Sequence, residues 1–507
     1  MTSDLVQSNV RAVIDRLASQ TPDNLFLVDP TAERKISYAE LKTSCVAVTN
    51  RLAELGIERG QSVGYAMTNG ADAALVILGC LYGGYLATAI NLVSGKSTIG
   101  YVLEHSEAKA VICQQHTKSL LDEAAPNSTA KFVDVADISF LDDLEVATSA
   151  PKSTDDGLLM YTSGTTGVPK GVVLSQSSLL AGGENTAIAH GLTSSDRGLC
   201  VLPLYHINGL CVTLLGTLVS GSSLVLPQKF SVSEFWNHLR KQTGTWFSVV
   251  PTQISYLLNE AETNGHSMEG LEQLRFGRSA SAPLSPDVQQ AFESKFGVPV
   301  IETMGLTETA AQILSNPIDG IRKIGSPGIA YGNEVQIGDE AQAEVPRGQE
   351  GEVLVRGPNV MKGYLKNPDE TAKSITPEGW LRTGDLGRMD EDGYVYITGR
   401  LKELIIKGGE NIAPREIDDA LYSHPDVIEA AAFARDCPQY GQRVEAGVKL
   451  REGSILTQAD LRSLCEEKVG AFKSPDFFHV FPELPKGPSG KIQRLKLAEI
   501  TEQKESA

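Results

Sequence analysis

The sequence has no pair of cysteines spaced like the ligands of a zinc site. Its seven cysteines are scattered, mostly among apolar neighbours, and no C-x-x-C pattern occurs. Structural zinc sites usually contain such closely spaced pairs, so a zinc site is not expected. An odd number of dispersed cysteines also does not suggest a disulfide framework. We therefore expect reduced, buried thiols, as in a cytoplasmic protein.

Basic residues are too few to balance the acidic ones. The 507-residue chain has 63 Asp and Glu against 45 Lys and Arg, which gives a formal net charge of -18. A surface this acidic argues against nucleic acid or an anionic membrane as the main partner. Small anionic ligands remain compatible with it, because a local basic site can oppose the overall sign.

The N-terminus lacks the apolar run of a secretory signal, since Asp4 and Arg11 interrupt it. One uncharged stretch, Ala73–Val93, approaches the length of a membrane span. It contains three glycines, and its pattern divides into a helix over Ala73–Tyr82 and a buried strand over Tyr85–Ile90. We expect this stretch to lie in the core of a soluble protein. The alternative is a membrane-spanning helix.

Helical and strand patterns alternate over the first three hundred residues, which favours parallel sheets with right-handed crossovers. We predict an α/β fold with a large N-terminal unit of residues 1–401. Its doubly wound sheets occupy residues 1–320, and a small β-barrel or antiparallel sheet occupies residues 321–400, where short alternating runs lie between turns. A smaller α+β unit follows over residues 402–507. Expected helices include Val10–Ser19, Tyr38–Leu55, Gly209–Val219, Pro286–Phe296 and Thr457–Val469, and expected strands include Ser62–Met67, Ala110–Cys113 and Val298–Glu302.

The strongest functional signal is the stretch Tyr161–Gly171, which holds four serine and threonine residues, three glycines and a lysine. Apolar residues Leu158–Met160 precede it and Val172–Leu174 follow it, and both flanks are predicted to be buried strands. Glycines allow a tight turn, and clustered N–H and hydroxyl groups can hold an anion. We expect a polyphosphate here, and the alternative is an ordinary solvated turn. The Walker pattern does not fit, because it requires Gly-Lys-Ser/Thr before a helix.

The order of residues in this loop resembles the phosphate loop of the adenylate-forming enzymes, which include acyl-CoA synthetases, luciferases and adenylation domains. Five further motifs follow in the order that this superfamily has them. The resemblance therefore implies the adenylate-forming enzyme fold, with a mobile C-terminal domain. The motifs are Pro203–Gly209, Glu302–Thr309, Gly379–Gly387, Thr398–Ile405 with Lys407–Asn411 after it, and Leu484–Lys491.

The resemblance assigns roles to single residues. It places His206 on the route to the acyl carboxylate and makes Glu308 the Mg²⁺ ligand, which suits a hard cation held by a carboxylate and phosphate oxygens. Asp385 would bind the ribose hydroxyls, and Arg400 would add a ribose and phosphate contact. Met304 stands where the family usually has an aromatic residue against adenine, and a thioether can still cover a ring face.

The resemblance also implies the full set of ligand-binding residues. Lys491 matches the mobile catalytic lysine and Lys402 the hinge, while Lys407, Gly408 and Gly409 match the lining of the pantetheine tunnel. His206, Thr165, Glu308 and Lys491 are the expected catalytic residues, and Thr165 joins Glu308 at the metal. The expected nucleotide- and CoA-binding residues are Thr162, Ser163, Gly164, Thr165, Thr166, Gly167, Lys170, Ser281, Thr303, Met304, Gly305, Thr307, Asp385, Arg400, Lys402, Lys407, Gly408, Gly409 and Lys491.

These roles imply an ATP-dependent acid–CoA ligase that forms AMP. An acid is activated as acyl-AMP, pyrophosphate leaves, and the CoA thiol then takes the acyl group. Two anions must meet, so catalysis depends mainly on charge neutralisation and positioning. A pivot at Lys402 would exchange Lys491 for the Lys407–Gly409 face between the two steps. The expected partners are ATP, Mg²⁺, CoA and a carboxylic acid, for a cytoplasmic monomer or homodimer without nucleic acid or membrane insertion.

The acid is less well defined by the sequence. The family places its pocket at His206–Gly209, Ser248–Val250, Arg278–Ser281 and Gly305–Gln312. The run at Arg278 is more polar than a fatty-acyl pocket requires. Arg278 is either a surface charge or the partner of a second carboxylate on the substrate. We expect a small to medium, oxygenated acid, as in oxalate- or coumarate-type ligases, with carnitine- or fatty-acid-type ligases as the other resemblance.

Three other functions are compatible with parts of the sequence. An amino-acid adenylation domain that serves a carrier protein usually has Phe-Asp where Tyr205-His206 stands, and no carrier module follows Lys491. A luciferase-like oxygenase is not required by any motif. A catalytically silent nucleotide sensor is the third alternative, and the presence of both Glu308 and Lys491 argues against it.

Overall fold

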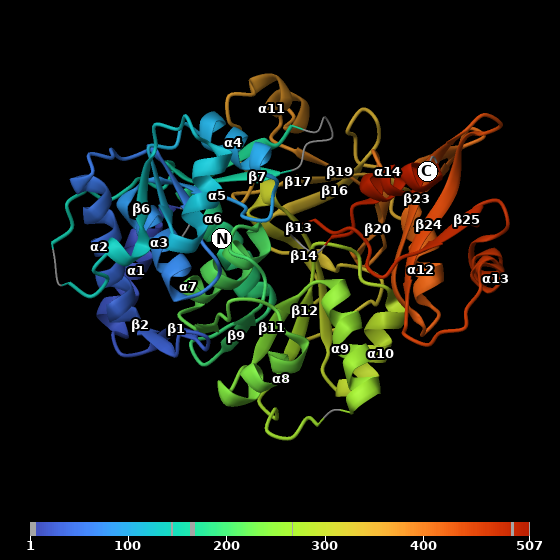
Figure 1. Ribbon diagram of the computed structural model, residues 1–507, viewed down its shortest axis with the longest axis horizontal. Helices are drawn as coiled ribbons and strands as arrows, with labels where there is room; N and C mark the ends of the chain where they lie inside the picture. The colour runs from blue at the N-terminus through green and yellow to red at the C-terminus, as the bar shows by residue number, and fades with distance from the viewer. Residues whose placement is uncertain (1–6, 143–144, 163–167, 266, 488–490, 506–507) are drawn as a thin grey trace.

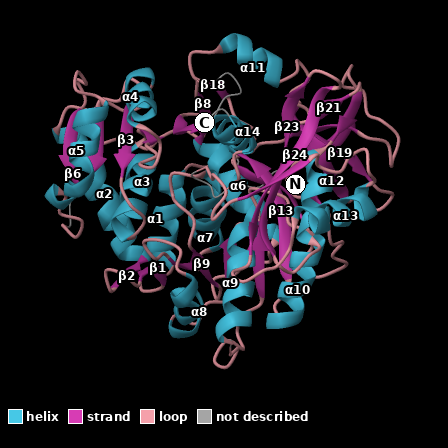
Figure 2. Cartoon of the chain, turned by 45° about the vertical axis from the view of Figure 1, so that its right-hand side comes forward, coloured by secondary structure: helices cyan, strands magenta, loops and turns pink. Residues whose placement is uncertain are grey.

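The protein is described by a computed structural model covering residues 7–142, 145–162, 168–265, 267–487 and 491–505 (Figure 1). We call residues 7–400 the body and residues 401–505 the C-terminal lobe. The body contains two large sheets and a smaller antiparallel one, and the lobe contains a fourth sheet. Helices flank the large sheets, while β19, β21, β23 and β24 gather on one side of the molecule (Figure 2). These four strands are β19 (Leu381–Met389), β21 (Ile405–Lys407), β23 (Val427–Cys437) and β24 (Gly441–Leu450).

The first large sheet of the body has nine strands. They are β1 (Leu25–Asp29), β2 (Arg34–Ser37), β9 (Arg197–Cys200), β10 (Ser223–Val225), β11 (Trp246–Val249), β12 (Phe276–Ser279), β13 (Val300–Leu306), β14 (Ala311–Ser315) and β15 (Ile329–Ala330). Their order is β15-β14-β13-β12-β11-β9-β10-β1-β2. The strands from β13 to β1 run parallel, and antiparallel strands close both edges. Consequently the carboxyl ends of β9, β11, β12 and β13 open on the same side of the sheet.

The second large sheet has seven strands. They are β3 (Ser62–Ala66), β4 (Leu86–Ala89), β5 (Ala110–Cys113), β6 (Lys131–Asp134), β7 (Asp156–Thr162), β8 (Lys170–Ser175) and β18 (Gly363–Tyr364). Their order is β18-β8-β7-β4-β3-β5-β6, with parallel pairing from β7 to β6. β7 and β8 pair antiparallel, so the chain reverses between Thr162 and Lys170.

Buried helices join the two large sheets. The body helices are α1 (Val10–Gln20), α2 (Tyr38–Glu54), α3 (Ala71–Gly83), α4 (Lys96–His105), α5 (Gln115–Ala124), α6 (Gln176–Ala189), α7 (Gly216–Ser220), α8 (Val232–Lys241), α9 (Pro251–Asn264), α10 (Pro286–Phe296) and α11 (Pro368–Ser374). α3 contacts β1 of one sheet and β3 and β4 of the other, and α6 contacts β14 of one and β7 of the other. The two sheets therefore share one helical layer and one core.

Most of the uncharged stretch Ala73–Val93, up to Ile90, belongs to this core. It forms α3 and β4, as predicted, and every α3 residue except Asp72 is buried. A side chain at Gly79 would meet Val48 of α2 at 2.5 Å, so this glycine permits the close contact of the two helices. Over the ranges that the structure describes, no helix has both the length and the apolar character needed to cross a bilayer.

The third sheet and the C-terminal lobe are mainly antiparallel. β16 (Glu334–Gly338), β17 (Gly351–Arg356), β19 and β20 (Val395–Arg400) form a four-stranded sheet, which confirms the small antiparallel unit. The lobe sheet contains β21, β22 (Glu410–Ile412), the long β23–β24 hairpin and β25 (Phe477–Val480). The lobe helices are α12 (Pro414–Tyr422), α13 (Gln458–Val469) and α14 (Arg494–Glu505). α9 and α10 of the body lie beside β23 and α12 of the lobe (Figure 1).

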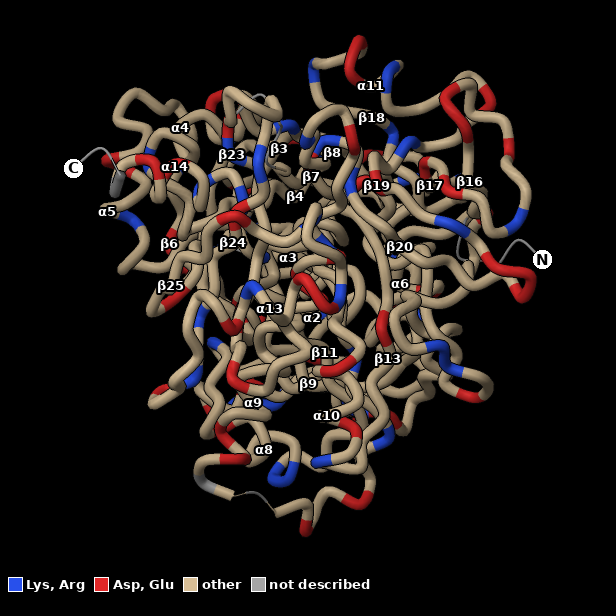
Figure 3. Tube along the Cα trace, turned by 90° about the vertical axis from the view of Figure 1, so that its right-hand side faces the viewer, with Lys and Arg blue, Asp and Glu red and all other residues tan. Residues whose placement is uncertain are grey.

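The predicted α/β fold is confirmed, with informative local differences. The predicted helix Gly209–Val219 is a π-helix, η3 (Asn208–Leu215), that continues as α7. The predicted strand Val298–Glu302 begins later and continues to Leu306, so it delivers residues into the site. Lys and Arg positions are interspersed with Asp and Glu along the trace in the view of Figure 3.

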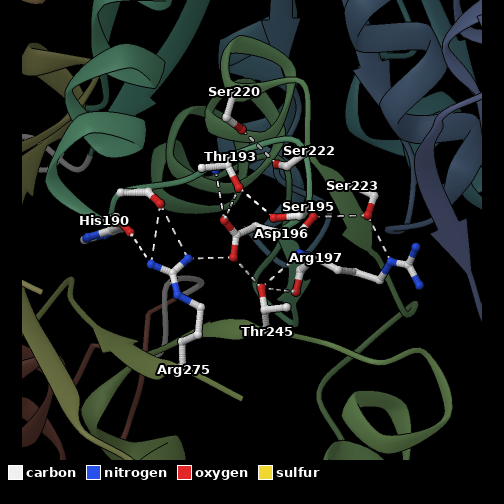
Figure 4. Close-up of polar contacts among 11 residues, drawn as sticks. His190, Thr193, Ser195, Asp196, Arg197, Ser220, Ser222, Ser223, Thr245 and Arg275 are labelled. Atoms are coloured by element: carbon white, nitrogen blue, oxygen red, sulfur yellow. Dashed lines mark hydrogen bonds and ion pairs between the residues drawn. The ribbon is translucent and has the colours of Figure 1, made fainter. Parts of the chain in front are cut away.

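A polar network centred on Asp196 ties together the amino ends of three parallel strands (Figure 4). Asp196 precedes β9, and its Oδ1 accepts hydrogen bonds from Thr245 Oγ1, before β11, at 2.8 Å and from Arg275 Nη1, before β12, at 2.6 Å. Its Oδ2 accepts from the backbone N–H of Thr193 at 2.9 Å. Burial alone would raise the pKa of Asp196, but these hydrogen bonds lower it below its usual value. The network therefore fixes the amino ends of these three strands, on the side of the sheet opposite their carboxyl ends.

Replacing Asp196 with Asn should lower the free energy of unfolding of the body at pH 7 by about 2 kcal/mol, because Arg275 loses its charged partner. Since the folded-state pKa is depressed, the stabilisation is present above the unfolded pKa and disappears as pH falls through the folded one. Urea titration followed by tryptophan fluorescence measures this, with the exposed Asp122 changed to Asn as the control. An unchanged midpoint at pH 7 would show that the network does not stabilise the sheet.

Candidate active site

The glycine- and hydroxyl-rich stretch joins β7 to β8, and both predicted flanking strands are confirmed. Ser163, Gly164, Thr165, Thr166 and Gly167 lie outside the described residues. The structure describes the chain on either side of them, up to Thr162 and from Val168 onward. Thr162 and Lys170 are paired across the hairpin. Lys170 Nζ forms an ion pair with Glu370 and lies 5.1 Å from the centre of the Tyr364 ring.

Glu308 lies beside this hairpin, on the 3-10 turn η4 (Thr307–Thr309) that follows β13. Its backbone carbonyl accepts a hydrogen bond from the Met361 N–H at 2.8 Å, and its Oε1 accepts from Tyr364 Oη at 3.0 Å. Tyr364 is itself paired with Val172 of β8. Burial and the charge of Glu308 raise the pKa of Tyr364, so its hydroxyl stays protonated and keeps donating. One tyrosine thus connects the predicted metal ligand to the exit of the phosphate loop.

Asp385 and Arg400 face each other on β19 and β20. Arg400 Nε donates to Asp385 Oδ1 at 2.5 Å, and Asp385 is only 5% exposed. Burial would lower the pKa of Arg400, but the charges of Asp385, Glu403 and Glu308 raise it. The ion pair therefore lies within electrostatic range of Glu308, and three motifs far apart in the sequence share one site.

Lys491 reaches this site from the C-terminal lobe. Its Nζ lies 3.6 Å from Glu403 Oε1, and the side chain is half-buried. Burial and the nearby charge of Arg400 lower the pKa of Lys491, while Glu403 and Asp385 oppose that shift. Lys491 also lines a pocket between the two parts of the molecule, with Val250–Thr252 and Ser281–Ser285 on the body side. The lobe is thus oriented with the predicted catalytic lysine facing the cleft.

β13 carries the next predicted residues into the cleft. The hydroxyl of Thr303 is buried without a hydrogen-bond partner among the described residues. Met304 packs beside the core of the third sheet. A Cβ atom on Gly305 would meet the Ala311 carbonyl oxygen at 1.9 Å, so only glycine allows β13 and β14 to approach this closely. Thr307 follows at the start of η4.

Polar side chains gather around Arg278, where the sequence predicts the acyl pocket. Arg278 is 1% exposed, and its Nη1 donates to Asn208 Oδ1 at 2.7 Å and to Ser248 Oγ at 3.1 Å. Asn208 Nδ2 donates to Ser281 Oγ at 3.1 Å, and Ser281 has a φ of 74°, an uncommon value for a residue other than glycine. Arg278 Nε donates to Gln312 Oε1 at 3.4 Å. Four segments predicted to form the pocket therefore meet.

His206 lies two residues before Asn208, at the start of the π-helical stretch η3. Its Nδ1 accepts a hydrogen bond from the Asn208 N–H at 3.3 Å. Burial lowers the pKa of His206 to about 4, so the ring is neutral at physiological pH. A neutral imidazole at this position borders the polar pocket without adding a charge to it.

The structure does not bring every predicted residue into this cleft. Lys402 is exposed in the turn between β20 and β21. Lys407 Nζ donates to the Phe472 carbonyl at 3.0 Å and lies 5.3 Å from the centre of the Phe472 ring, inside the C-terminal lobe. Gly408 and Gly409 form the β21–β22 turn beside it. In this orientation the predicted CoA face is separate from Lys491.

Comparison with known proteins identifies the architecture. Residues 14–365 match the AMP-binding enzyme family, and residues 416–491 match the AMP-binding enzyme C-terminal domain.

The chain belongs to the AMP-binding enzyme family.

Members of this family that resemble the chain along nearly its whole length are acid–CoA ligases. A sulfoacetate–CoA ligase of Cupriavidus necator is 44% identical, over 98% of both chains. An oxalate–CoA ligase of Arabidopsis thaliana is 34% identical, over 96% of this chain and 97% of the relative. The ATP-bound structure of MatB from Rhodopseudomonas palustris has a TM-score of 0.88 at 30% identity, covering 97% of this chain and 99% of MatB. The predicted superfamily, fold and enzyme class are therefore confirmed.

AMP-binding enzymes of the CoA ligase class use ATP, Mg²⁺ and CoA, as the sequence predicted. The part of the chain that the structure describes contains no group of three or more His, Cys, Asp or Glu placed to hold a metal ion. Mg²⁺ is typically held by one or two carboxylates together with phosphate oxygens. Glu308, which accepts a hydrogen bond from Tyr364, is the carboxylate that the sequence predicts for this role.

Sequence reasoning missed two residues that shape this AMP-binding site. Tyr364 donates a hydrogen bond to Glu308, and Glu403 forms an ion pair with Lys491. The motifs assigned no role to either residue. Tyr364 lies in a two-residue strand, which is too short to give a periodic signal. Glu403 lies inside the Thr398–Ile405 motif, so its position next to the predicted hinge was the one available signal.

Proposed function

We propose that this AMP-binding enzyme joins CoA to a short carboxylic acid that carries a second anionic group. The residues named above would form its site, and Lys402 would be the hinge between an N-terminal domain of residues 1–401 and a mobile domain of residues 402–507. We also propose that it acts in the cytoplasm, as a monomer or homodimer. The proposal concerns the identity of the acid, because the ligase class follows from the family.

The observation that supports this substrate is the buried guanidinium of Arg278. Burial lowers the pKa of Arg278 to about 9, so the group stays positively charged at neutral pH. Its partners are the neutral side chains of Asn208, Ser248 and Gln312. Throughout the described ranges no carboxylate forms a salt bridge with it, although buried cations are usually paired. An anionic group of the substrate would complete this site as a bidentate partner.

The names of the relatives support the same class of acid. Sulfoacetate contains a carboxylate and a sulfonate, and oxalate contains two carboxylates. A 2-succinylbenzoate–CoA ligase of Bacillus licheniformis, 32% identical to this chain, also acts on an acid with two carboxylates. The shared feature is a second negative charge in addition to the reacting carboxylate, and Arg278 is a suitable cation for it.

Different residues would act on different parts of the reaction. The substrate carboxylate attacks the α-phosphorus, an O–P bond forms, and the bond to pyrophosphate breaks. Lys491 and the donors at Thr162 onward would neutralise the phosphate charge, and Asp385 would fix the ribose. Mg²⁺ at Glu308 would supply further charge neutralisation. The thiol of CoA, after losing its proton, then attacks the acyl carbon, and AMP leaves.

A panel of acids with ATP, Mg²⁺ and CoA tests the proposed substrate. Sulfoacetate, oxalate and malonate should release pyrophosphate and give a CoA thioester, identified by mass spectrometry. Acetate, propionate and octanoate should have kcat/KM values lower by about a hundredfold, since they leave Arg278 unpaired. Preference for octanoate or a coumarate would contradict the proposal. Acid-dependent pyrophosphate release without a CoA thioester would instead indicate a carrier-protein acceptor.

Changing Glu308 to Gln should lower the rate of acyl-AMP formation by about a hundredfold, because a neutral amide is a poor Mg²⁺ ligand. The Mg²⁺ concentration for half-maximal pyrophosphate release should rise at the same time. A titration of Mg²⁺ measures both quantities, with the exposed Glu378 changed to Gln as the control. Loss of rate with an unchanged Mg²⁺ requirement would exclude Glu308 as a metal ligand.

The fall in the rate of acyl-AMP formation at high pH should reflect deprotonation of Lys491. Because burial and Arg400 lower its pKa, the ammonium loses its proton at a lower pH than an ordinary lysine does. Acyl-AMP formation should therefore decline with rising pH already below the usual pKa of a lysine. Changing Lys491 to Arg should move that decline to higher pH, whatever the absolute rate, because a guanidinium stays protonated. A pH profile of pyrophosphate exchange measures this, and identical profiles would refute the assignment.

A further inference from the structure

One side chain of the body is held by charged groups of the C-terminal lobe. Tyr256 projects from α9 toward β23, where its Oη donates a hydrogen bond to Glu429 Oε1. The same oxygen accepts a hydrogen bond from Lys486 Nζ at 2.7 Å. Lys449 Nζ lies 4.8 Å from the centre of the Tyr256 ring, within range of a cation–π interaction. We call these three lobe residues, Glu429, Lys449 and Lys486, the tyrosine socket.

The charges of the tyrosine socket are paired with one another within the lobe, even without Tyr256. Glu429 is 0% exposed, and its Oε1 lies 2.8 Å from Lys486 Nζ and 3.7 Å from Lys449 Nζ. Its Oε2 accepts a hydrogen bond from the Leu484 N–H at 3.2 Å. If Tyr256 is withdrawn, Glu429 therefore keeps two cations and a backbone donor, and the penalty of an unpaired buried charge does not arise. The contact can thus form and break reversibly.

The socket is joined directly to the segment that carries Lys491. Lys486 forms an isolated antiparallel bridge with Ile492. The Gly487 N–H donates to the Lys491 carbonyl at 2.7 Å, and the Gln493 N–H donates to the Pro485 carbonyl at 2.8 Å. These backbone bonds fix Lys491 relative to Lys486. A body residue that binds Lys486 therefore also sets the position of Lys491 against the body.

A second contact between α9 and the lobe is more exposed. Arg451 of the lobe pairs with Glu262 of α9 at 2.5 Å, but these side chains are 26% and 45% exposed. Exposed ion pairs contribute little to stability, because water competes with them. The buried contact at Tyr256 is therefore the stronger candidate for controlling how the lobe docks on α9.

We propose that Tyr256 is a positioning residue that holds the lobe in the orientation for acyl-AMP formation and releases it for thioester formation. This inference rests on the proposed function in one respect, the assignment of Lys491 to the first step. Tyr256 touches neither ATP nor the acid in this account. It acts through Lys486, and so it should influence one half-reaction and not the other.

Changing Tyr256 to Phe removes only the hydroxyl and tests this inference. With sulfoacetate as the probe acid, pyrophosphate exchange should fall by about tenfold, the effect of losing one hydrogen bond to a charged group. Thioester formation from chemically prepared sulfoacetyl-AMP and CoA should stay within about twofold of the parent enzyme. The control is Tyr394→Phe, which removes a hydrogen bond to the Ile321 carbonyl inside the body and should leave both half-reactions unchanged.

Hydrogen exchange gives a readout that does not depend on the acid. In Tyr256→Phe the amides of α9 and β23 should exchange faster, because the lobe undocks more often, while those of β3 and β5 should not change. Unchanged exchange in α9 and β23, or an equal loss in both half-reactions, would overturn the inference. If the parent enzyme adenylates no acid in the panel, the proposed function fails, and the exchange result still decides whether Tyr256 holds the lobe.

Discussion

Replacing Lys491 with Ala should slow acyl-AMP formation by about a thousandfold, because the attacking carboxylate and the phosphate would then meet without that cation. Lys491 is placed for this role by its position beside Glu403 and within range of the Asp385–Arg400 pair. Thioester formation from preformed acyl-AMP should be nearly unaffected. In the second step no pyrophosphate leaves, and the lobe would present the Lys407–Gly409 face instead.

The two half-reactions must be measured separately to test this expectation. Acid-dependent pyrophosphate exchange reports the first step, and the release of AMP from synthetic acyl-AMP and CoA reports the second. The exposed Lys496, five residues further along the same segment, provides the control when changed to Ala. Equal damage to both steps would refute the assignment of Lys491 to acyl-AMP formation alone.

Changing Arg278 to Gln should lower kcat/KM for sulfoacetate by about a hundredfold or more, as expected for the loss of a buried charge partner. The amide can still donate to Asn208 or Ser248, but it has no charge and no fork of parallel donors. Acids with one anionic group, such as propionate, should lose little or should improve. The substitution therefore changes the preference of the enzyme more than its overall capacity.

Arg278→Lys separates charge from geometry in the same measurement. It keeps the positive charge but loses the bidentate donor geometry, so activity with sulfoacetate should lie between those of the parent and Arg278→Gln. A uniform loss for sulfoacetate and propionate would show that Arg278 supports the fold of the pocket and does not recognise the second anion.

The fold was largely predictable where the pattern is local and strong. Ser37 caps the N-terminus of α2 and forms a capping box with Glu40, and this signal is present in the sequence. The region between Thr117 and Asp156 was harder to interpret, and it contains α5 and β6, of which only a few residues are buried. Weak burial gives weak periodicity, so these two elements did not stand out.

The site was predictable for a different reason, because six ordered motifs supplied its residues through a resemblance. What they did not supply was the environment of Arg278, for which a surface charge and a buried anion partner remained open. Burial excludes the surface charge, and it depends on packing against Asn208, Ser248 and Gln312 from three other segments. The contact of Tyr256 with Glu429 joins residues 173 positions apart, and no local pattern encodes such a pairing.

A crystal structure with a non-hydrolysable sulfoacetyl-AMP analogue would test the central claim most directly. The account predicts the ribose at Asp385, the phosphate position between Thr162 and Lys491, and the sulfonate within hydrogen-bond distance of Arg278. A ribose bound away from Asp385, or a sulfonate directed into solvent with Arg278 still surrounded by neutral groups, would contradict it.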